Sequence, residues 1–212
     1  GMAALLPHKT MSLTDYDGGV LVDGLPTTST ADREAVLQSF RPNSKAILFS
    51  DLIDMKSSER KEFAGGATII YVYQNTIDKA GHAEHVGQDV FDACDQAIKD
   101  MKTLVDISCK DLGAQNVLIT SDHGFLYTRQ DLNEMNLSSK KQVDGEVLKA
   151  ERRFLAASPG SRSDIFINMN MEDLDGGKWT WLVARGCQRI KASGSKNYVH
   201  GGISLQECCV PV

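Results

Sequence analysis

Residues 116–124 read Asn-Val-Leu-Ile-Thr-Ser-Asp-His-Gly, and the predicted fold depends most on this stretch. A short apolar run followed by turn-forming residues is typical of a buried strand. The run predicts a strand over 116–120, and Asp122 and His123 follow its carboxyl end. This strand therefore carries a carboxylate and an imidazole side by side to its tip.

The residues before this run predict a βαβ unit. Another apolar run, rich in β-branched and aromatic residues, predicts a strand over 67–73. Between the two runs, apolar residues recur at helical spacing from Val86 to Leu112, and Gly113 can end such a helix. A strand, helix and strand in succession pair their strands in parallel. With a further strand predicted over 45–49, the sequence indicates an α/β fold, a mostly parallel sheet flanked by helices.

The second half of the chain predicts a small insertion. Residues 124–150 are polar and loop-like, and we expect 124–180 to form an insertion of loops and strands within a single domain spanning 1–212. A capping-box pattern at Ser204 to Glu207 predicts a helix start just after the His200-Gly-Gly turn. Further strands are predicted over 154–157, 165–169 and 179–183, with Asp175-Gly176-Gly177 as a hairpin turn before the last.

Composition excludes several classes of protein. The chain has 212 residues and a net charge of -5, which argues against a surface that binds nucleic acid by bulk attraction. No apolar run approaches the roughly 18 residues of a membrane span. The five cysteines are odd in number and lack CxxC spacing, so reduced thiols in a cytoplasmic protein are the simplest interpretation. The apolar character of both chain ends indicates a piece of a longer protein.

Three of the five histidines follow predicted strands or turns, and each has a ligand-type neighbour or flanking glycines. Asp78 and His82 follow the strand over 67–73, Asp122 and His123 follow the next, and His200 lies in a glycine-flanked turn. Ligands of open α/β sheets bind beyond the carboxyl ends of the strands, so these five side chains could converge on one crevice. Carboxylate and imidazole are ligands of divalent transition metals.

Each motif alone has a simpler interpretation. An Asp-His pair after a strand is more often a capping or hydrogen-bonding pair than a metal site, so the prediction depends on the three motifs together. Arg152 and Arg153 are predicted to be solvated charges at a strand edge, and the alternative is phosphate binding through a guanidinium group.

The chain resembles the alkaline phosphatase superfamily, and within it most closely the PglZ family of bacterial phage-resistance systems. The resemblance covers nearly the whole chain. It rests on IIYVYQNTIDKAGH (69–82), VLITSDHGFLYT (117–128), ERRF (151–154) and YVHGGISLQECCVPV (198–212). Many PglZ sequences resemble IDxxGD where this chain has His82, as more distant superfamily members do, and this favours a competent metal site.

The resemblance implies a site for two divalent metal ions, usually zinc and sometimes manganese. By motif, Asp78 and His82 would ligate one metal together with His200, and Asp122 and His123 would ligate the other. In the superfamily an Asp-bearing strand and a Ser or Thr nucleophile at a helix start lie upstream of the segment that this chain begins with. No catalytic nucleophile is therefore assigned within the chain, which we expect to be inactive by itself.

Two functions follow as hypotheses. In the first, the chain is part of a metal-dependent phosphoester hydrolase of a bacterial phage-defence or signalling protein, with a phosphoester substrate, a nucleotide among the candidates, and protein partners in a defence complex. In the second, it is a non-catalytic interaction module of such a complex that retains a remnant metal site.

Overall fold

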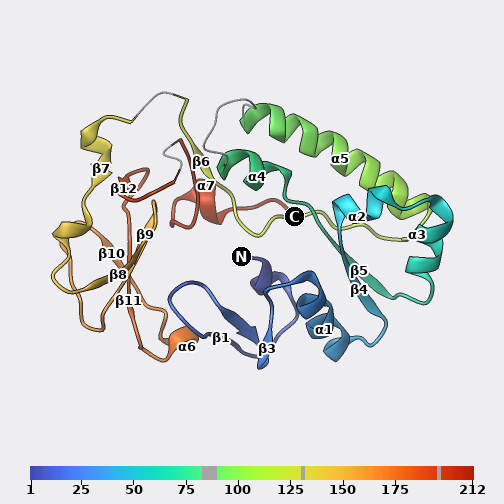
Figure 1. Cartoon of the computed structure of the whole chain (residues 1–212), viewed down its shortest axis with the longest axis horizontal. Helices are drawn as coiled ribbons and strands as arrows, with labels where there is room; N and C mark the ends of the chain where they lie inside the picture. Colours follow the sequence, from blue (N-terminus) through green and yellow to red (C-terminus); the bar gives the residue numbers. More distant parts are fainter. Residues whose placement is uncertain (83–89, 130–131, 195–196) are drawn as a thin grey trace. The chain divides into compact units, whose positions relative to one another are not determined.

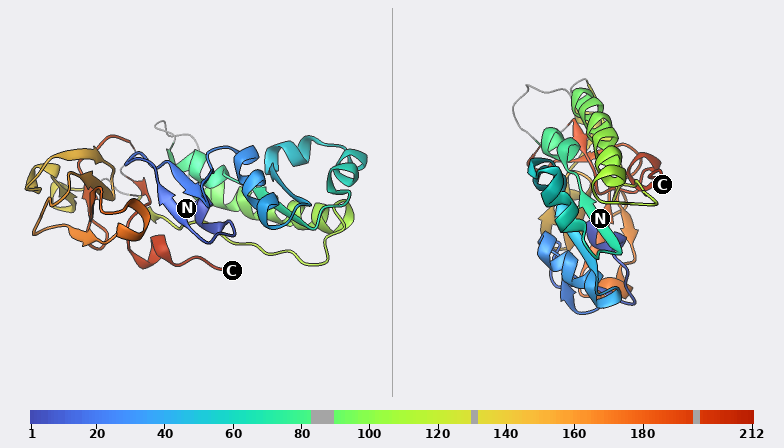
Figure 2. Two further views of the ribbon diagram at one scale, coloured as in Figure 1. Left: turned by 90° about the horizontal axis from the view of Figure 1, so that it is seen from below. Right: turned by 90° about the vertical axis from the view of Figure 1, so that its right-hand side faces the viewer.

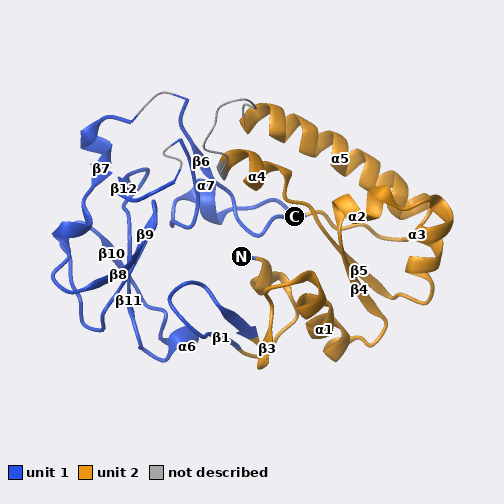
Figure 3. Ribbon diagram, viewed as in Figure 1, with its two compact units in different colours: residues 1, 11–21, 120–212 blue, residues 2–10, 22–119 orange. Residues whose placement is uncertain are grey.

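The computed structural model describes residues 1–82, 90–129, 132–194 and 197–212. These residues group into two compact units, which Figure 3 distinguishes by colour. Both helices and strands are present, so the predicted mixed α/β class is confirmed. Unit 1 comprises residues 1, 11–21 and 120–212, and unit 2 comprises residues 2–10 and 22–119.

Unit 2 is built on a parallel pair of strands (Figure 1). β4 (Ser44–Leu48) and β5 (Ile69–Tyr73) pair in parallel over their full lengths. Two helices, α2 (Phe49–Asp54) and α3 (Ser57–Ala64), lie between them in the chain. The strands predicted over 45–49 and 67–73 are therefore confirmed, and for this pair the predicted parallel arrangement is confirmed as well.

The core of unit 2 contains side chains from this strand pair and from three helices. Ile47 of β4, Leu52 of α2 and Ile107 of α5 (Val90–Lys110) form a buried cluster. Complete burial of such a side chain contributes about 1.5–3 kcal/mol, so the cluster is a main source of stability for this unit. The partly buried residues packed against it are Met55, Phe63, Ile70, Val72, Leu104 and Leu112.

α5 is the long helix that the apolar spacing predicts, and it runs along one side of unit 2 (Figure 2). The predicted first turn, residues 86–89, lies outside the described residues. The helix packs against α4 (Thr76–His82) and ends at Lys110. Gly113 follows with a φ of 68°, a left-handed conformation that glycine adopts without steric cost and that stops the helix from continuing.

The strand predicted over 116–120 is absent from the described structure. This segment has no regular secondary structure there, and Val117, Leu118 and Ile119 are 41%, 76% and 48% exposed. Hydrophobicity alone identifies an extended apolar run, whereas a strand also requires a neighbouring strand that supplies backbone partners. The predicted βαβ unit therefore lacks its second strand, and the parallel sheet of unit 2 is confirmed only for β4 and β5.

The remainder of unit 2 is short. A 3-10 helix spans Met2–Leu5, and β3 (Leu25–Pro26) precedes α1 (Thr30–Phe40). Ser29 caps α1 through a capping box with Asp32, whose backbone N–H donates to Ser29 Oγ at 3.0 Å. None of the described helices combines the length and the apolar character that a bilayer-spanning helix needs.

Unit 1 is built on a four-stranded antiparallel sheet in the order β10-β11-β9-β8. The strands predicted over 154–157, 165–169 and 179–183 are confirmed as β9, β10 and β11. The core on this sheet contains Leu155, Phe166, Leu182, Ala184 and Ile190. The bounds are β8 (Val147–Ala150), β9 (Phe154–Ala157), β10 (Ile167–Met169) and β11 (Thr180–Val183), with α6 (Glu172–Asp175) between the last two.

Shorter elements complete unit 1. β1 (Met11–Leu13) lies beside β2 (Val20–Val22). The boundary between the units falls within β2, because Val22 belongs to unit 2. β12 (Arg189–Ile190) pairs in parallel with β7 (Leu137–Ser138). The other elements are β6 (Leu126–Tyr127), β13 (Tyr198–Val199), α7 (Leu205–Cys208) and 3-10 helices at Glu134–Asn136 and Lys140–Gln142.

Candidate metal centre

A short strand pair in unit 1 brings two of the predicted ligand segments together. β6 and β13 pair antiparallel, with Tyr198 opposite Tyr127 and Val199 opposite Leu126. Tyr198, Val199 and Leu126 are all buried, which keeps the two strands in this register. In an antiparallel pair the residues after one strand lie near the residues before the other, so His200 returns towards His123.

The rings of His123 and His200 are stacked. Their centroids lie 4.2 Å apart and their planes differ by 10°. A ligand nitrogen of one lies within 4.8 Å of a ligand nitrogen of the other. The structure thus brings together two imidazoles that are 77 positions apart in the sequence, as the motifs predict.

Asp122 lies beside His123 in unit 1. Its Oδ2 lies 3.8 Å from Nε2 of His123, and the two side chains are 14% and 22% exposed. On the other side of the ring, Nδ1 of His123 lies 3.0 Å from the carbonyl oxygen of Gly124. A carbonyl only accepts, so Nδ1 carries a proton, and in the neutral ring Nε2 is the nitrogen with a lone pair.

This arrangement fits a divalent cation. The 3.8 Å gap between Nε2 and Oδ2 is longer than a hydrogen bond, and two metal–ligand bonds of about 2.0–2.2 Å each can span it. The Nδ1 contact to a backbone carbonyl is the orienting interaction that metal-bound histidines commonly have. Ser121 adds to the order of the loop, because its hydroxyl donates to the carbonyl oxygen of His123 at 2.6 Å.

The other two predicted ligands belong to unit 2. Asp78 lies in the first turn of α4 and is half-buried. His82 is the last residue of the same helix, and its side chain lies outside the described part of the chain. Residues four apart on a helix share one face, so the backbone of α4 is compatible with both side chains holding one ion.

Arg152 and Arg153, for which solvation and phosphate binding were the alternatives, both contact backbone carbonyl groups. Nη2 of Arg152 donates to the carbonyl oxygen of Gly194 at 2.7 Å, and burial lowers the pKa of this guanidinium. Arg153 is fully buried and forms an ion pair with Glu207, with Nε 2.8 Å from Oε1. The predicted solvation is wrong for Arg153, and its guanidinium is occupied by internal partners.

Glu207 is a functional candidate that the sequence motifs did not indicate beyond its place in a capping box. That capping box on α7 is confirmed, with Ser204 as the cap and Glu207 as its third residue. The partner Arg153 lies 54 positions earlier, and no local pattern links them. Burial raises the pKa of Glu207, but the hydrogen bonds and charge of Arg153, the hydroxyl of Ser204 and the N–H of Gly202 outweigh it, so its pKa lies below the usual value.

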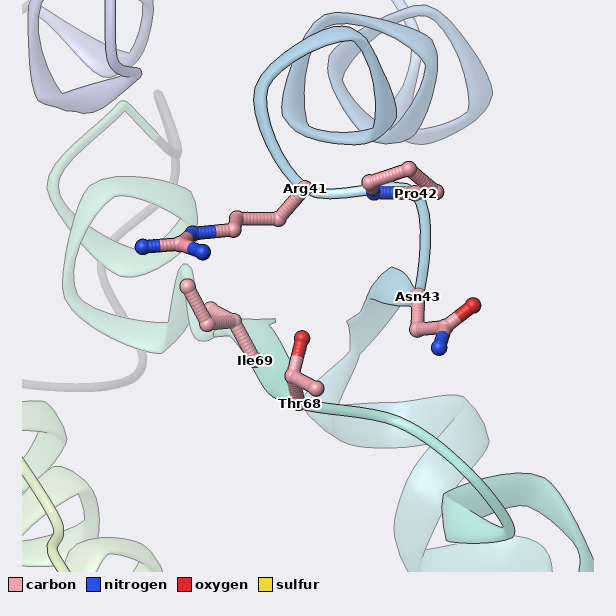
Figure 4. Close-up of a pocket in the computed structure, with 5 residues that line it drawn as sticks. All are labelled: Arg41, Pro42, Asn43, Thr68 and Ile69. Carbon is pink, nitrogen blue, oxygen red and sulfur yellow. The ribbon is translucent and has the colours of Figure 1, made fainter.

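A separate pocket in unit 2 takes no part in this arrangement. Arg41, Pro42 and Asn43 line it from the link between α1 and β4, and Thr68 and Ile69 line it from the start of β5 (Figure 4). It therefore lies at the amino ends of the parallel strands, whereas ligands of such sheets bind at the carboxyl ends. None of the predicted metal ligands lines it.

Comparisons with known proteins place all 212 residues in one family. Residues 1–212 match the family model described as the BREX system PglZ alkaline phosphatase-like domain. The chain is 34% identical over 216 residues to the alkaline phosphatase-like protein PglZ of Bacillus cereus (strain H3081.97). It is 31% identical over 215 residues to the alkaline phosphatase-like protein BrxZ of Escherichia coli O9:H4 (strain HS).

Both alignments cover 100% of this chain and 25% of the relative, so the chain spans about a quarter of the length of these curated relatives. No solved structure gives a significant match.

Proposed function

Because the chain belongs to the PglZ family of alkaline phosphatase-like domains, we propose that it forms part of a metal-dependent phosphoester hydrolase. The observation that carries the proposal is that His123 lies beside both Asp122 and His200 in unit 1. This arrangement places two imidazoles and a carboxylate close together, with one ring nitrogen held by a backbone carbonyl.

We assign the ligands to two ions. Asp122 and His123 hold one, and Asp78, His82 and His200 hold the other. Zinc suits this mixture of nitrogen and oxygen ligands, and manganese is the alternative. Carboxylates offset the positive charge of the ions, whereas neutral imidazoles add ligands without adding charge.

The roles of the residues follow from these positions. When bound, the two ions would stabilise the attacking and leaving oxygens of a phosphoryl transfer. His123 donates its Nδ1 proton to the carbonyl oxygen of Gly124, which holds the ring with Nε2 turned towards the carboxylate of Asp122. Asp122 and His123 are adjacent in the sequence, so the short turn after Thr120 positions both.

The wider proposal concerns the whole protein. We propose that its substrate is a phosphoester, that a nucleotide is a candidate for it, and that the protein acts with partners in a bacterial defence system. The chain matches a BREX family model, and its relatives carry the names PglZ and BrxZ, which supports this context. None of the five cysteines is in a disulfide, which supports a reducing compartment such as the cytoplasm.

We further propose that the complete domain has a mostly parallel sheet that includes β4 and β5, with residues 124–180 as an insertion. The antiparallel pairing of β8 to β11, which differs from the parallel pairing of β4 and β5, is compatible with an insertion of this kind.

Metal binding by the purified chain tests the proposal. Elemental analysis and competitive titration should find bound divalent metal. Asp122→Ala should weaken binding of the ion shared with His123, and His200→Ala that of the ion shared with Asp78 and His82, each by about 10-fold or more, because each variant removes a direct ligand. His8→Ala is the control, since His8 belongs to unit 2 and its Nδ1 contacts the carbonyl oxygen of Leu6 in the same unit.

Hydrolysis of a generic phosphomonoester or phosphodiester is then measured on the protein at its full natural length. Loss of turnover in Asp122→Ala, with His8→Ala active, supports the enzyme. An unaltered metal content in both ligand variants would refute the assignment. A chain that binds no divalent ion, in a full-length protein without hydrolysis, would support the non-catalytic interaction module.

A further inference from the structure

The carboxylate of Glu207 binds the segment that carries His200. Oε1 accepts from the backbone N–H of Gly202 at 2.9 Å, and Oε2 accepts from the hydroxyl of Ser204 at 2.7 Å and from its N–H at 3.2 Å. Gly202 lies two residues after His200. The carboxylate thus binds the turn that follows His200 in the chain.

The backbone of the same residue binds the segment that carries His123. The carbonyl oxygen of Glu207 accepts from the N–H of Gly124 at 2.9 Å. The carbonyl oxygen of Gly124 in turn accepts a hydrogen bond from Nδ1 of His123. One residue of α7 therefore contacts both histidine segments, one through its side chain and the other through its main chain.

The approach leaves no room for a side chain at either glycine unless neighbouring atoms shift. A Cβ on Gly124 would overlap the carbonyl oxygen of Gln206. A Cβ on Gly202 would lie 2.6 Å from Oε2 of Glu207 and from two nitrogens of Arg153. Both contacts would be closer than Cβ atoms normally approach other heavy atoms. The glycines of the two motifs therefore allow the close packing against α7 and Arg153.

Arg153 fixes Glu207 in turn. Its Nε and Nη2 donate to the two carboxylate oxygens at 2.8 and 2.9 Å, the bidentate geometry in which guanidinium and carboxylate bind most specifically. Nη2 also donates to the carbonyl oxygen of Gly186 at 2.6 Å, and Nη1 donates to that of Gln188. The side chains of the pair are 0% and 1% exposed, so solvent does not compete for these bonds.

We propose that Glu207, anchored by Arg153, is a positioning residue that holds the His123 and His200 segments at the spacing the metal centre needs. The inference rests on the proposed function for its metal, but its geometry belongs to unit 1 alone. Neither residue is assigned as a ligand. Outer partners that orient the ligands of a metal typically change its affinity by about 10–100-fold when they are removed.

The test compares Glu207→Gln with Asp175→Asn in the chain. The glutamine side chain would place an amide –NH₂ group where the carboxylate now accepts from Arg153 and Ser204. Two hydrogen-bond donors would then face each other, and these hydrogen bonds would be lost. Asp175 is the matched control because it is a buried acid of the same unit, 3% exposed, that accepts from Trp181 Nε1 at 2.7 Å. Both variants should lower the melting temperature. Only Glu207→Gln should lower divalent-metal affinity, by about 10–100-fold.

A second readout needs no metal. In the metal-free chain, the protons of the His123 and His200 rings should show a nuclear Overhauser effect, because the ring centroids lie 4.2 Å apart. The effect should persist in Asp175→Asn and disappear in Glu207→Gln. Ser204→Ala, which removes a single donor to Oε2, gives a milder variant if Glu207→Gln does not fold, and it should reduce the effect and weaken zinc binding several-fold.

The outcomes separate the inference from the proposed function. If the unaltered chain binds no zinc but the ring contact depends on Glu207, the positioning role holds and the metal centre proposed for this chain fails. If zinc affinity and the ring contact survive in Glu207→Gln and in Ser204→Ala, Glu207 is only a helix cap and the inference is overturned. Equal loss of zinc affinity in Asp175→Asn would also overturn it.

Discussion

The carboxylate of Glu207 caps α7 and also joins the Arg153 pair, and the sequence predicts these two roles to different degrees. The Ser204 to Glu207 spacing is local, so the capping box can be predicted from the sequence alone. The partner Arg153 is 54 positions away, and its choice depends on how β9 and α7 pack. Local chemistry is predictable here, whereas long-range pairing is not.

Because the pKa of Glu207 is lowered in the folded chain, unit 1 should lose stability as the pH falls. A carboxyl group whose pKa is lower in the folded chain adds stability above its unfolded pKa of about 4.3, and this stability is lost as the pH falls through the folded value. The melting temperature of the unaltered chain should therefore exceed that of Glu207→Gln most at neutral pH. The difference should narrow below about pH 4. A difference that stays constant from pH 7 to pH 3 would contradict this assignment.

Gly124→Ala tests the close approach of α7. The new Cβ would overlap the carbonyl oxygen of Gln206, a backbone atom that cannot swing aside. Overpacking of this kind costs about 1–3 kcal/mol, which chemical denaturation can measure. Gly65→Ala is the comparison, because a Cβ there meets its nearest atom at 3.1 Å and should cost less. Equal stabilities of the two variants would argue against the tight contact.

Among the helices and strands, periodicity predicts α5 well and hydrophobicity mispredicts residues 116–120. The buried positions of α5 recur along one face over 21 residues, and such a long pattern has few alternative explanations. The run from Val117 to Ile119 is short, and its apolar character does not specify a pairing partner. β4 and β5 are predicted correctly because they pair with each other in the same unit.

Two isoleucines on α5 allow a matched test of the core of unit 2. Ile107 is 7% exposed and belongs to the cluster with Ile47 and Leu52, whereas Ile98 is 54% exposed on the same helix. Ile107→Ala should destabilise the chain by about 2–5 kcal/mol through lost burial and the cavity it leaves. Ile98→Ala should change stability by no more than about 0.5 kcal/mol. Denaturant titration measures both, and similar losses would contradict the described packing of α5.

For the chain as a whole, the motifs predict that five side chains gather at one site. The structure brings Asp122, His123 and His200 together in unit 1, while Asp78 and His82 lie on α4 in unit 2. Convergence of all five stays a prediction, as does a single domain with an insertion over 124–180. Each motif follows a predicted strand or turn, so the sequence could indicate which residues are candidate ligands of one site. It could not indicate how two separately packed units are arranged.

Metal binding should stabilise the whole chain if the proposed centre is correct. A ligand that binds only the folded state adds about 2.7 kcal/mol at 100 times its dissociation constant. Zinc should therefore raise the melting temperature of the unaltered chain, and a chelator should reverse the change. The same addition should raise the melting temperature of Asp122→Ala by less, because that variant lacks a ligand of one of the two ions. An equal rise in that variant would place the bound zinc elsewhere.

The exposed run from Val117 to Ile119 has a further consequence for the purified chain. Asn116 to Ser121 is uncharged, rich in β-branched residues and without proline, the composition of segments that self-associate into intermolecular β-structure. Leu118, at 76% exposed, is the most accessible of its three large apolar residues. A single positive charge at this position, in the variant Leu118→Lys, should oppose the pairing of this segment between molecules. The chain should therefore aggregate more readily at high concentration than its Leu118→Lys variant, a difference that light scattering would detect.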